Sequence, residues 1–166
     1  MSVNIALLTV TDTRTLETDK SGNILVEKIK KAKHNLVERK ICKDIKEDIK
    51  IILKEWTLKK DLDVIITTGG TGLTGRDITP EALDEIADKH IPGFGEIFRY
   101  FSLETVGTSS IQSRACAILS NGKYIFALPG SSGGVTDAWD KILVHQLDIN
   151  HKPCNFVELF PRLKEK

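Results

Sequence analysis

The segment Thr67–Asp77 combines glycines, threonines and a carboxylate in the order Thr-Thr-Gly-Gly-Thr-Gly-Leu-Thr-Gly-Arg-Asp. Glycines let the backbone approach a ligand closely, and exposed backbone N–H groups hold phosphate oxygens. A carboxylate beside such a loop suits a magnesium-bound phosphate, because Mg²⁺ takes oxygen ligands from an acid and from the substrate together. We therefore interpret this segment as a phosphate cradle, with Asp77 as a candidate magnesium ligand.

Two common glycine motifs fit this segment only superficially. Gly70, Gly72 and Gly75 satisfy the G-x-G-x-x-G pattern of dinucleotide sites, which also requires an acid at the end of a strand ~20 residues on. That place is held by Asp88, at the end of a predicted helix. The spacing also resembles a P-loop, but Arg76-Asp77 replaces the Lys-Ser/Thr pair that binds phosphate and magnesium. Neither motif is supported.

A second loop, Leu128–Gly134, has the sequence Leu-Pro-Gly-Ser-Ser-Gly-Gly and follows another predicted strand. Ligands of open parallel sheets bind at the carboxyl ends of strands, so both loops are expected to face the same site.

Arg14 follows the first predicted strand and is a further candidate phosphate contact, although a lone loop arginine is usually solvated.

Helix capping is the structural alternative for both candidate aspartates. Asp77 precedes a helix that begins near Thr79, although Thr79-Pro80 supplies better capping chemistry. Asp44 stands three residues before Glu47 at the start of an amphipathic helix, which is typical of a capping box. Local sequence alone favours a capping role for Asp44.

Composition excludes several classes of protein. The 166 residues include 24 basic and 23 acidic side chains, and this near-neutral balance disfavours nucleic-acid binding. No apolar stretch approaches the ~20 residues of a membrane span, and the N-terminal residues lack the basic region of a leader. Cys42, Cys116 and Cys154 show neither metal-ligand spacing nor a disulfide pattern, so we expect reduced structural thiols. These features predict a cytoplasmic protein.

The elements that must position these loops alternate along the chain. Apolar runs predict strands and amphipathic stretches predict helices, while Asn121-Gly122 between two apolar runs predicts an antiparallel hairpin. The expected strands are Val3–Val10, Leu36–Ile41, Asp63–Thr68, Ala115–Leu119 and Tyr124–Leu128; the expected helices are Ser21–Lys33, Asp44–Trp56, one opening at Thr79-Pro80-Glu81, Phe94–Glu104 and Gly134–Leu147. The order predicts one α/β domain over residues 1–166, with three αβα layers, a mostly parallel sheet and an irregular tail from about 149.

Several long segments resemble the MoaB/MogA family of molybdenum cofactor proteins. The segments Thr67–Ala82 and Leu128–Ser131 are similar to the family as a whole, and the segments Gly93–Arg99, Gly107–Ala115 and Lys152–Phe156 resemble its MoaB branch. Together they cover most of the chain from Val64 to Phe156. Matches this long and ordered are far more specific than a single glycine motif.

The resemblance implies the molybdopterin-binding fold, a homotrimer or homohexamer, and adenylylation of molybdopterin by ATP with Mg²⁺. Family members use two aspartates, which correspond to Asp44 and Asp77; these are our candidate catalytic residues and magnesium ligands. The predicted substrate-binding and phosphate-binding residues are Thr68, Gly69, Gly70, Thr71, Gly72, Arg76, Pro129, Gly130 and Ser131.

The predicted function is therefore molybdopterin adenylyltransferase, with molybdopterin and ATP as substrates, Mg²⁺ as cofactor and pyrophosphate as a product. Other enzymes of molybdenum cofactor synthesis are expected partners, whereas nucleic acid and membranes are not. The alternative is a non-catalytic protein of the same pathway that binds or carries molybdopterin through the same loops.

Overall fold

The computed structural model describes residues 1–165, which form a six-stranded sheet in the order β2-β1-β3-β6-β5-β4. The strands are β1 (Asn4–Val10), β2 (Asn35–Cys42), β3 (Val64–Thr68), β4 (Lys89–His90), β5 (Cys116–Ser120) and β6 (Lys123–Leu128). The pairs β1–β2, β1–β3 and β3–β6 are parallel, while β5 runs antiparallel to β6 and to β4. The predicted α/β class, with a mostly parallel sheet and one hairpin, is confirmed.

The turn between β5 and β6 shows why the hairpin was predictable. Asn121 and Gly122 both have positive φ angles, of 46° and 72°. Two-residue hairpin loops of this kind match the twist of the strands, and asparagine and glycine tolerate the left-handed backbone that they require. The short strand β4 was not predicted, because two residues carry no period.

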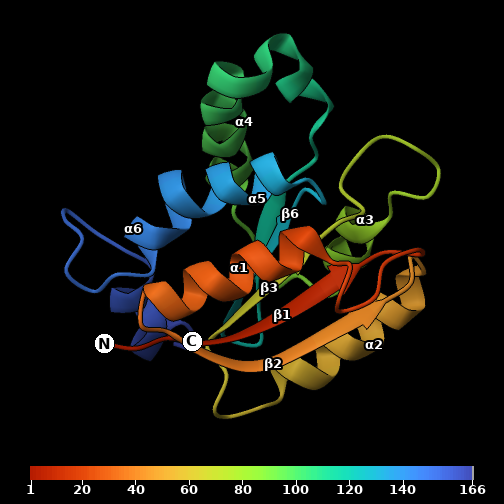
Figure 1. Cartoon of the computed structure of the whole chain (residues 1–166). Coiled ribbons are helices and arrows are strands. Elements are labelled where there is room, and N and C mark those ends of the chain that lie inside the picture. The colour runs from red at the N-terminus through yellow and green to blue at the C-terminus, as the bar shows by residue number, and fades with distance from the viewer. Residues whose placement is uncertain (166) are drawn as a thin grey trace.

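Helices cover both faces of the sheet (Figure 1). The helical elements are α1 (Lys20–Lys31), α2 (Lys46–Thr57), α3 (Thr79–Asp84), α4 (Pro92–Val106), the 3₁₀ helix η1 (Gly107–Gln112), α5 (Ser132–Ala138), the π-helical turn η2 (Trp139–Leu143), α6 (Val144–Gln146) and the 3₁₀ helix η3 (Val157–Arg162). The predicted helix Gly134–Leu147 is thus continuous but contains a π turn. η3 lies in the predicted tail, where Phe156 and Phe160 pack against the core.

Two hydrophobic cores lie on opposite faces of the sheet, which explains the three layers. Ile5 and Leu7 of β1 pack in the core under α1, α4 and α5, whereas Ala6 and Leu8 pack in the core under α2 and α3. Successive side chains of a strand point to opposite faces, so a strand buried on both faces has a continuous apolar sequence. β1 has that pattern, and Ile5 to Leu8 are fully buried.

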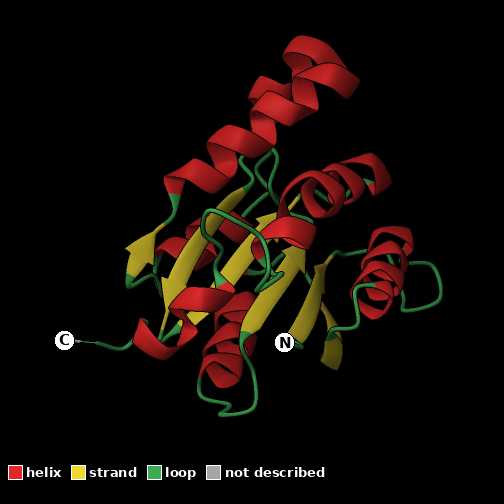
Figure 2. Ribbon diagram, turned by 90° about the vertical axis from the view of Figure 1, so that its left-hand side faces the viewer, coloured by secondary structure: helices red, strands yellow, loops and turns green. Residues whose placement is uncertain are grey.

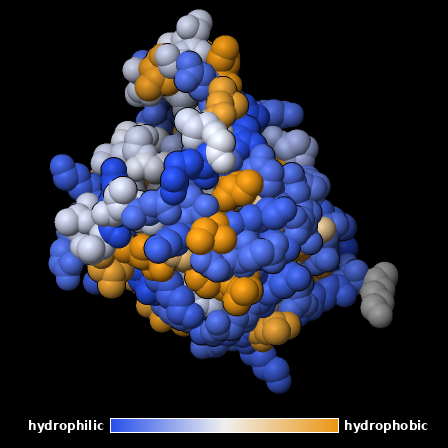
Figure 3. Space-filling model, turned by 90° about the vertical axis from the view of Figure 1, so that its right-hand side faces the viewer, coloured by the Kyte–Doolittle hydropathy of each residue, from blue (hydrophilic) through white to orange (hydrophobic). Residues whose placement is uncertain are grey.

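Helix α4 is longer than the predicted Phe94–Glu104 and projects from the body of the molecule together with η1 (Figures 1 and 2). Its base is buried at Phe94 and Phe98, but its outer part leaves large apolar side chains exposed: Ile97, Tyr100, Leu103 and Val106, with Ile111 in η1. Apolar side chains are visible at this projecting end (Figure 3). No helix within residues 1–165 combines the length and apolarity needed to cross a membrane.

Candidate functional site

The carboxyl ends of β1, β2, β3 and β6 are adjacent, and the loops that follow them surround a cavity of about 1110 Å³. Loops after parallel strands emerge on one edge of the sheet, which brings together residues that are far apart in sequence. Every predicted site residue except Arg76 lines this cavity.

Glycine is required where the first loop leaves β3. Gly69 has a φ of +105°, and its N–H donates to the carbonyl of Leu128 over 3.0 Å. A Cβ at Gly69 would lie only 2.2 Å from the carbonyl oxygen of Val10, and one at Gly130 would lie 3.3 Å from the α-carbon of Gly69. The loops after β3 and β6 therefore approach each other backbone to backbone, as only glycine permits.

Threonine hydroxyls fix the loops in this position. Thr68 Oγ1 donates to the carbonyl of Pro129 over 2.7 Å and so joins the ends of β3 and β6. Thr79 Oγ1 donates to the carbonyl of Gly69 over 2.9 Å, and the Thr79 N–H donates to the carbonyl of Gly70 over 3.0 Å. Thr79 is the first residue of α3 rather than its N-cap, so its predicted capping role is wrong: its side chain holds the glycine loop instead.

The second loop enters helix α5. Ser131 is the N-cap of α5, and its Oγ accepts a hydrogen bond from the Gly134 N–H over 3.1 Å. The Oγ of Ser131 thus has a structural role in addition to its position on the cavity wall.

Asp44 does not cap α2. The helix begins at Lys46, its N-cap is Ile45, and no side chain caps it. The capping-box interpretation of Asp44 is therefore wrong. Its backbone N–H donates to Asp12 Oδ1 over 3.2 Å, and it lines the cavity. Burial and the negative charge of Asp77 raise the pKa of the Asp44 carboxyl.

Asp77 does not cap a helix either, because the N-cap of α3 is Ile78 and no side chain caps that helix. Its Oδ2 accepts hydrogen bonds from Thr74 N–H over 2.9 Å and from Thr74 Oγ1 over 2.7 Å. Burial acts to raise the pKa of Asp77, but these bonds, the Gly72 N–H and the charge of Arg114 outweigh it, and the pKa is lowered. Asp77 is therefore ionised at neutral pH.

Both aspartates lie against the same glycine loop. A Cβ at Gly70 would lie 3.3 Å from Asp44 Oδ1, and one at Gly72 would lie 2.8 Å from Asp77 Oδ2. Within residues 1–165 there is no cluster of three or more His, Cys, Asp or Glu that could hold a metal by itself. Two carboxylates nevertheless fit Mg²⁺, which binds through one or two acids and completes its shell with substrate phosphates and water.

Of the two candidate arginines, Arg14 lines the cavity and Arg76 does not. Arg76 does not line the cavity: its side chain is 74% exposed and forms an ion pair with Asp12. Arg14 does line the cavity and is the only cationic side chain among its described lining residues, which also include Asp44, Asp77 and Asp137. Arg14 is therefore placed where it can contact a ligand in the cavity, whereas Arg76 is paired with Asp12 outside the lining.

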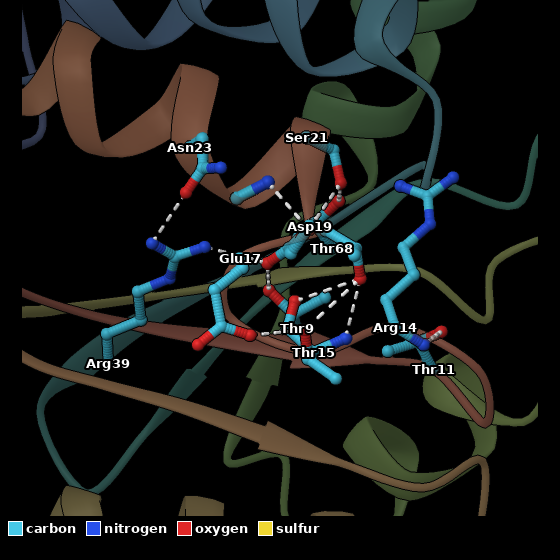
Figure 4. A network of polar contacts seen from close by, with 12 residues as sticks. Thr9, Thr11, Arg14, Thr15, Glu17, Asp19, Ser21, Asn23, Arg39 and Thr68 are labelled. Atoms are coloured by element: carbon cyan, nitrogen blue, oxygen red, sulfur yellow. Dashed lines mark hydrogen bonds and ion pairs between the residues drawn. The ribbon is translucent and has the colours of Figure 1, made fainter.

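A buried polar network anchors the loop that carries Arg14 (Figure 4). Asp19 is fully buried, and its carboxylate accepts from Thr9 Oγ1 over 2.6 Å, from Ser21 Oγ over 3.2 Å and from Gly22 N–H over 3.0 Å. Arg39 of β2 pairs with it over 3.0 Å. The network thus joins the end of β1, the middle of β2 and the start of α1 next to the cavity, where Thr9 and Ser21 also form part of the wall.

One wall of the cavity was missed by the interpretation of the sequence. It consists of hydroxyl and amide side chains from α4, η1 and the segment after η1: Ser102, Thr105, Ser109, Ser110, Gln112 and Ser113. The run Gly107–Ser113 is rich in hydroxyls, but nothing in its local pattern connects it with loops that precede it by about forty residues. Only the packing of α4 across the sheet places it there.

Comparison with known proteins agrees with this arrangement. Residues 6–149 match the family model described as a probable molybdopterin binding domain. Molybdenum cofactor biosynthesis protein B of Escherichia coli (strain K12) is 43% identical over 161 residues, which cover 97% of this chain and 93% of that protein. The chain belongs to the MoaB family. Membership of this family supports a role in molybdenum cofactor biosynthesis.

Other MoaB relatives extend the similarity to structure. The protein of the same name from Bacillus cereus is 45% identical over 146 residues, or 87% of this chain and 86% of that protein. A crystal structure of molybdenum cofactor biosynthesis protein B superposes with a TM-score of 0.89 at 40% identity, covering 100% of this chain and 98% of the other. The tungsten cofactor synthesizing protein MoaB from Pyrococcus furiosus has a TM-score of 0.76 at 36% identity, covering 86% and 91%. The MoaB fold is thus shared over the whole described chain.

Proposed function

We propose that this protein adenylylates molybdopterin. The terminal phosphate of molybdopterin attacks the α-phosphorus of ATP, the bond from that phosphorus to the β-phosphate bridge breaks, and pyrophosphate leaves. The product contains a new phosphoanhydride between molybdopterin and AMP. The attacking phosphate is already ionised at neutral pH, so the reaction needs positioning and charge neutralisation rather than a nucleophilic side chain.

One observation carries the proposal: two amide-rich loops and two carboxylates surround one cavity of about 1110 Å³. Ligand cavities commonly measure about 300–1,000 Å³, so there is room for two substrates. The loops after β3 and β6 touch at Gly69 and Gly130, which would bring the phosphates of both substrates close together.

The residues can be given distinct roles. Gly70, Thr71, Gly130 and Ser131 would hold phosphate oxygens through their backbone N–H groups. Gly69, Gly72 and Pro129 would shape the wall of the cavity, because the Gly69 N–H donates to Leu128, the Gly72 N–H bonds Asp77 and proline has no N–H. Asp44 and Asp77 would hold Mg²⁺, which supplies the positive charge that neutralises the phosphates when it is bound. Arg14 would contact a phosphate directly, because it already lies on the cavity wall.

The alternative from another class is a protein that binds molybdopterin without turnover. This alternative is favoured by the composition of the cavity wall, whose described acidic and basic side chains are three aspartates and a single arginine. A triphosphate is poorly neutralised by one arginine, so ATP affinity depends on the metal more strongly than molybdopterin affinity does.

The two functions are separated by incubating the purified protein with molybdopterin, ATP and Mg²⁺ and measuring pyrophosphate and adenylylated molybdopterin. The adenylyltransferase predicts equal amounts of both products, and omission of Mg²⁺ should stop the reaction. Tight molybdopterin binding without pyrophosphate release would reject the enzyme and support the carrier. Absence of binding would reject both.

Self-association and a cytoplasmic location are further parts of the proposal. The apolar side chains on the outer part of α4 support association between copies, since Tyr100 is 66% and Val106 53% exposed. Apolar side chains are visible at this projecting end of the molecule (Figure 3). Light scattering in solution distinguishes a trimer from a hexamer, and a monomer would contradict the proposed self-association.

We place the protein in the cytoplasm, where ATP is available.

A further inference from the structure

The loop that carries Asp77 is held at both ends by a single arginine, Arg114. Arg114 lies between η1 and β5, and its backbone N–H donates to the carbonyl of Thr71 over 2.8 Å. Its side chain donates from Nε to the carbonyl of Gly72 over 2.7 Å and from an Nη to the carbonyl of Asp77 over 2.9 Å. One guanidinium therefore sets the separation between the two ends of the Gly72–Asp77 loop.

Glu81 holds this guanidinium in place. Its carboxylate pairs with both terminal nitrogens of Arg114, one of them at 3.3 Å. Glu81 lies in the first turn of α3, directly after the loop. A planar guanidinium makes several hydrogen bonds in fixed directions, whereas the ammonium of lysine is a compact point charge on a flexible stem. Two carbonyls and a carboxylate arranged around one side chain thus require arginine.

The position of the Asp77 carboxylate depends on these loop ends. Its Oδ2 receives the N–H and the hydroxyl of Thr74 from within the loop, and Gly72 lies so close that a Cβ there would be 2.8 Å from Oδ2. Movement of either end would change where the carboxylate points. Arg114 itself is absent from the cavity lining and contacts Asp77 only through its carbonyl oxygen.

We propose that Arg114 is a positioning residue, which clamps the Gly72–Asp77 loop so that the Asp77 carboxylate faces the cavity beside Asp44. The inference rests on the proposed adenylylation, in which Asp77 holds the metal and the phosphates. Misplacement of a binding group by ~1 Å can cost about 10²-fold in rate, so the clamp affects turnover more than stability.

Arg99 offers a matched control. It is also a half-buried arginine that donates to backbone carbonyls of the same segment, those of Ser113 at 3.3 Å and Ala115 at 3.1 Å, but no contact joins it to the Gly72–Asp77 loop. Arg114→Lys and Arg99→Lys therefore each remove guanidinium hydrogen bonds to backbone carbonyls, but only Arg114→Lys removes bonds to the Gly72–Asp77 loop.

The test combines amide hydrogen exchange with steady-state kinetics on the full-length protein. In Arg114→Lys, we expect faster exchange confined to residues 72–77 and a kcat for pyrophosphate release lower by about 10²-fold, with KM for ATP little changed. In Arg99→Lys, exchange of residues 72–77 and kcat should remain those of the wild type. Wild-type loop exchange and kcat in Arg114→Lys would overturn the proposal.

Two further outcomes are also decisive. If Arg114→Lys does not fold, Glu81→Gln replaces it: faster exchange limited to residues 72–77 supports the clamp, and unchanged exchange overturns it. If the wild type releases no pyrophosphate, the adenylyltransferase proposal fails by itself. Amide hydrogen exchange of residues 72–77 in Arg114→Lys then still decides whether Arg114 holds the loop that carries Asp77.

Discussion

Two carboxylates near the cavity are held by similar partners but differ in what they can still bind. Asp19 and Asp77 each accept hydrogen bonds from threonine hydroxyls and from backbone N–H groups of their own segment. Each also has an arginine beside it. Arg39 pairs directly with the buried Asp19 carboxylate at 3.0 Å, whereas Arg114 contacts only the backbone carbonyl of Asp77.

This difference separates a structural carboxylate from a functional one. Asp19 is fully buried and accepts from four donors, so its charge stabilises the fold and is not available to a ligand. Asp77 retains part of its carboxylate toward the cavity, and its nearest arginine pairs with Glu81 instead. Burial and the donors around each carboxylate, not the type of residue, decide which one is available to a ligand.

The largest expected effect follows from removing the charge of Asp77. Asp77→Asn keeps an oxygen that can accept from Thr74, so the fold and the melting temperature should change little. Loss of the charge should lower kcat for pyrophosphate release by about 10³-fold. Asp84→Asn on α3, outside the cavity lining, is the matched control and should keep wild-type turnover. A variant Asp77→Asn that melts earlier but turns over normally would show that the residue is structural.

At Asp19 we expect a large effect on stability rather than on turnover. Asp19→Asn leaves the guanidinium of Arg39, whose side chain is only 18% exposed, without its counter-charge, which should lower the free energy of unfolding by about 3 kcal/mol in urea denaturation. The control is Asp140→Asn, which breaks the exposed Lys28–Asp140 pair and should cost less than about 1 kcal/mol. Equal losses in the two variants would contradict the structural role of Asp19.

A smaller effect is the dependence of this stabilisation on pH. Burial acts to raise the pKa of Asp19, but hydrogen bonds from Thr9 and Gly22 and the charge of Arg39 lower it below the ordinary value of 3.8. Its contribution to stability is therefore complete above that value and is lost as the pH falls through the folded-state pKa. The difference in unfolding free energy between wild type and Asp19→Asn should shrink below pH 3.8. A difference that is constant from pH 7 to pH 3 would reject this linkage.

The candidate site was predictable where its residues are close in sequence. Gly69–Gly72 and Asp77 lie in one loop after an apolar strand, and the Pro129–Ser131 loop follows another strand in the same way. Asp44 was harder, because its spacing to Glu47 is that of a capping box, while α2 in fact starts two residues later. Arg76 was chosen for its place in the loop, but its ion pair with Asp12 directs it away from the cavity.

The sequence by itself determined the order of the elements, the two glycine loops and the family, because apolar periodicity and local motifs are properties of neighbouring residues. Only the tertiary structure decided which side chains from distant segments meet. The clamp of Arg114 on Gly72 and Asp77 spans 42 and 37 residues, and the hydroxyl wall from α4 and η1 reaches the cavity only by packing. Such contacts depend on how helices lie across the sheet, and no local pattern encodes that arrangement.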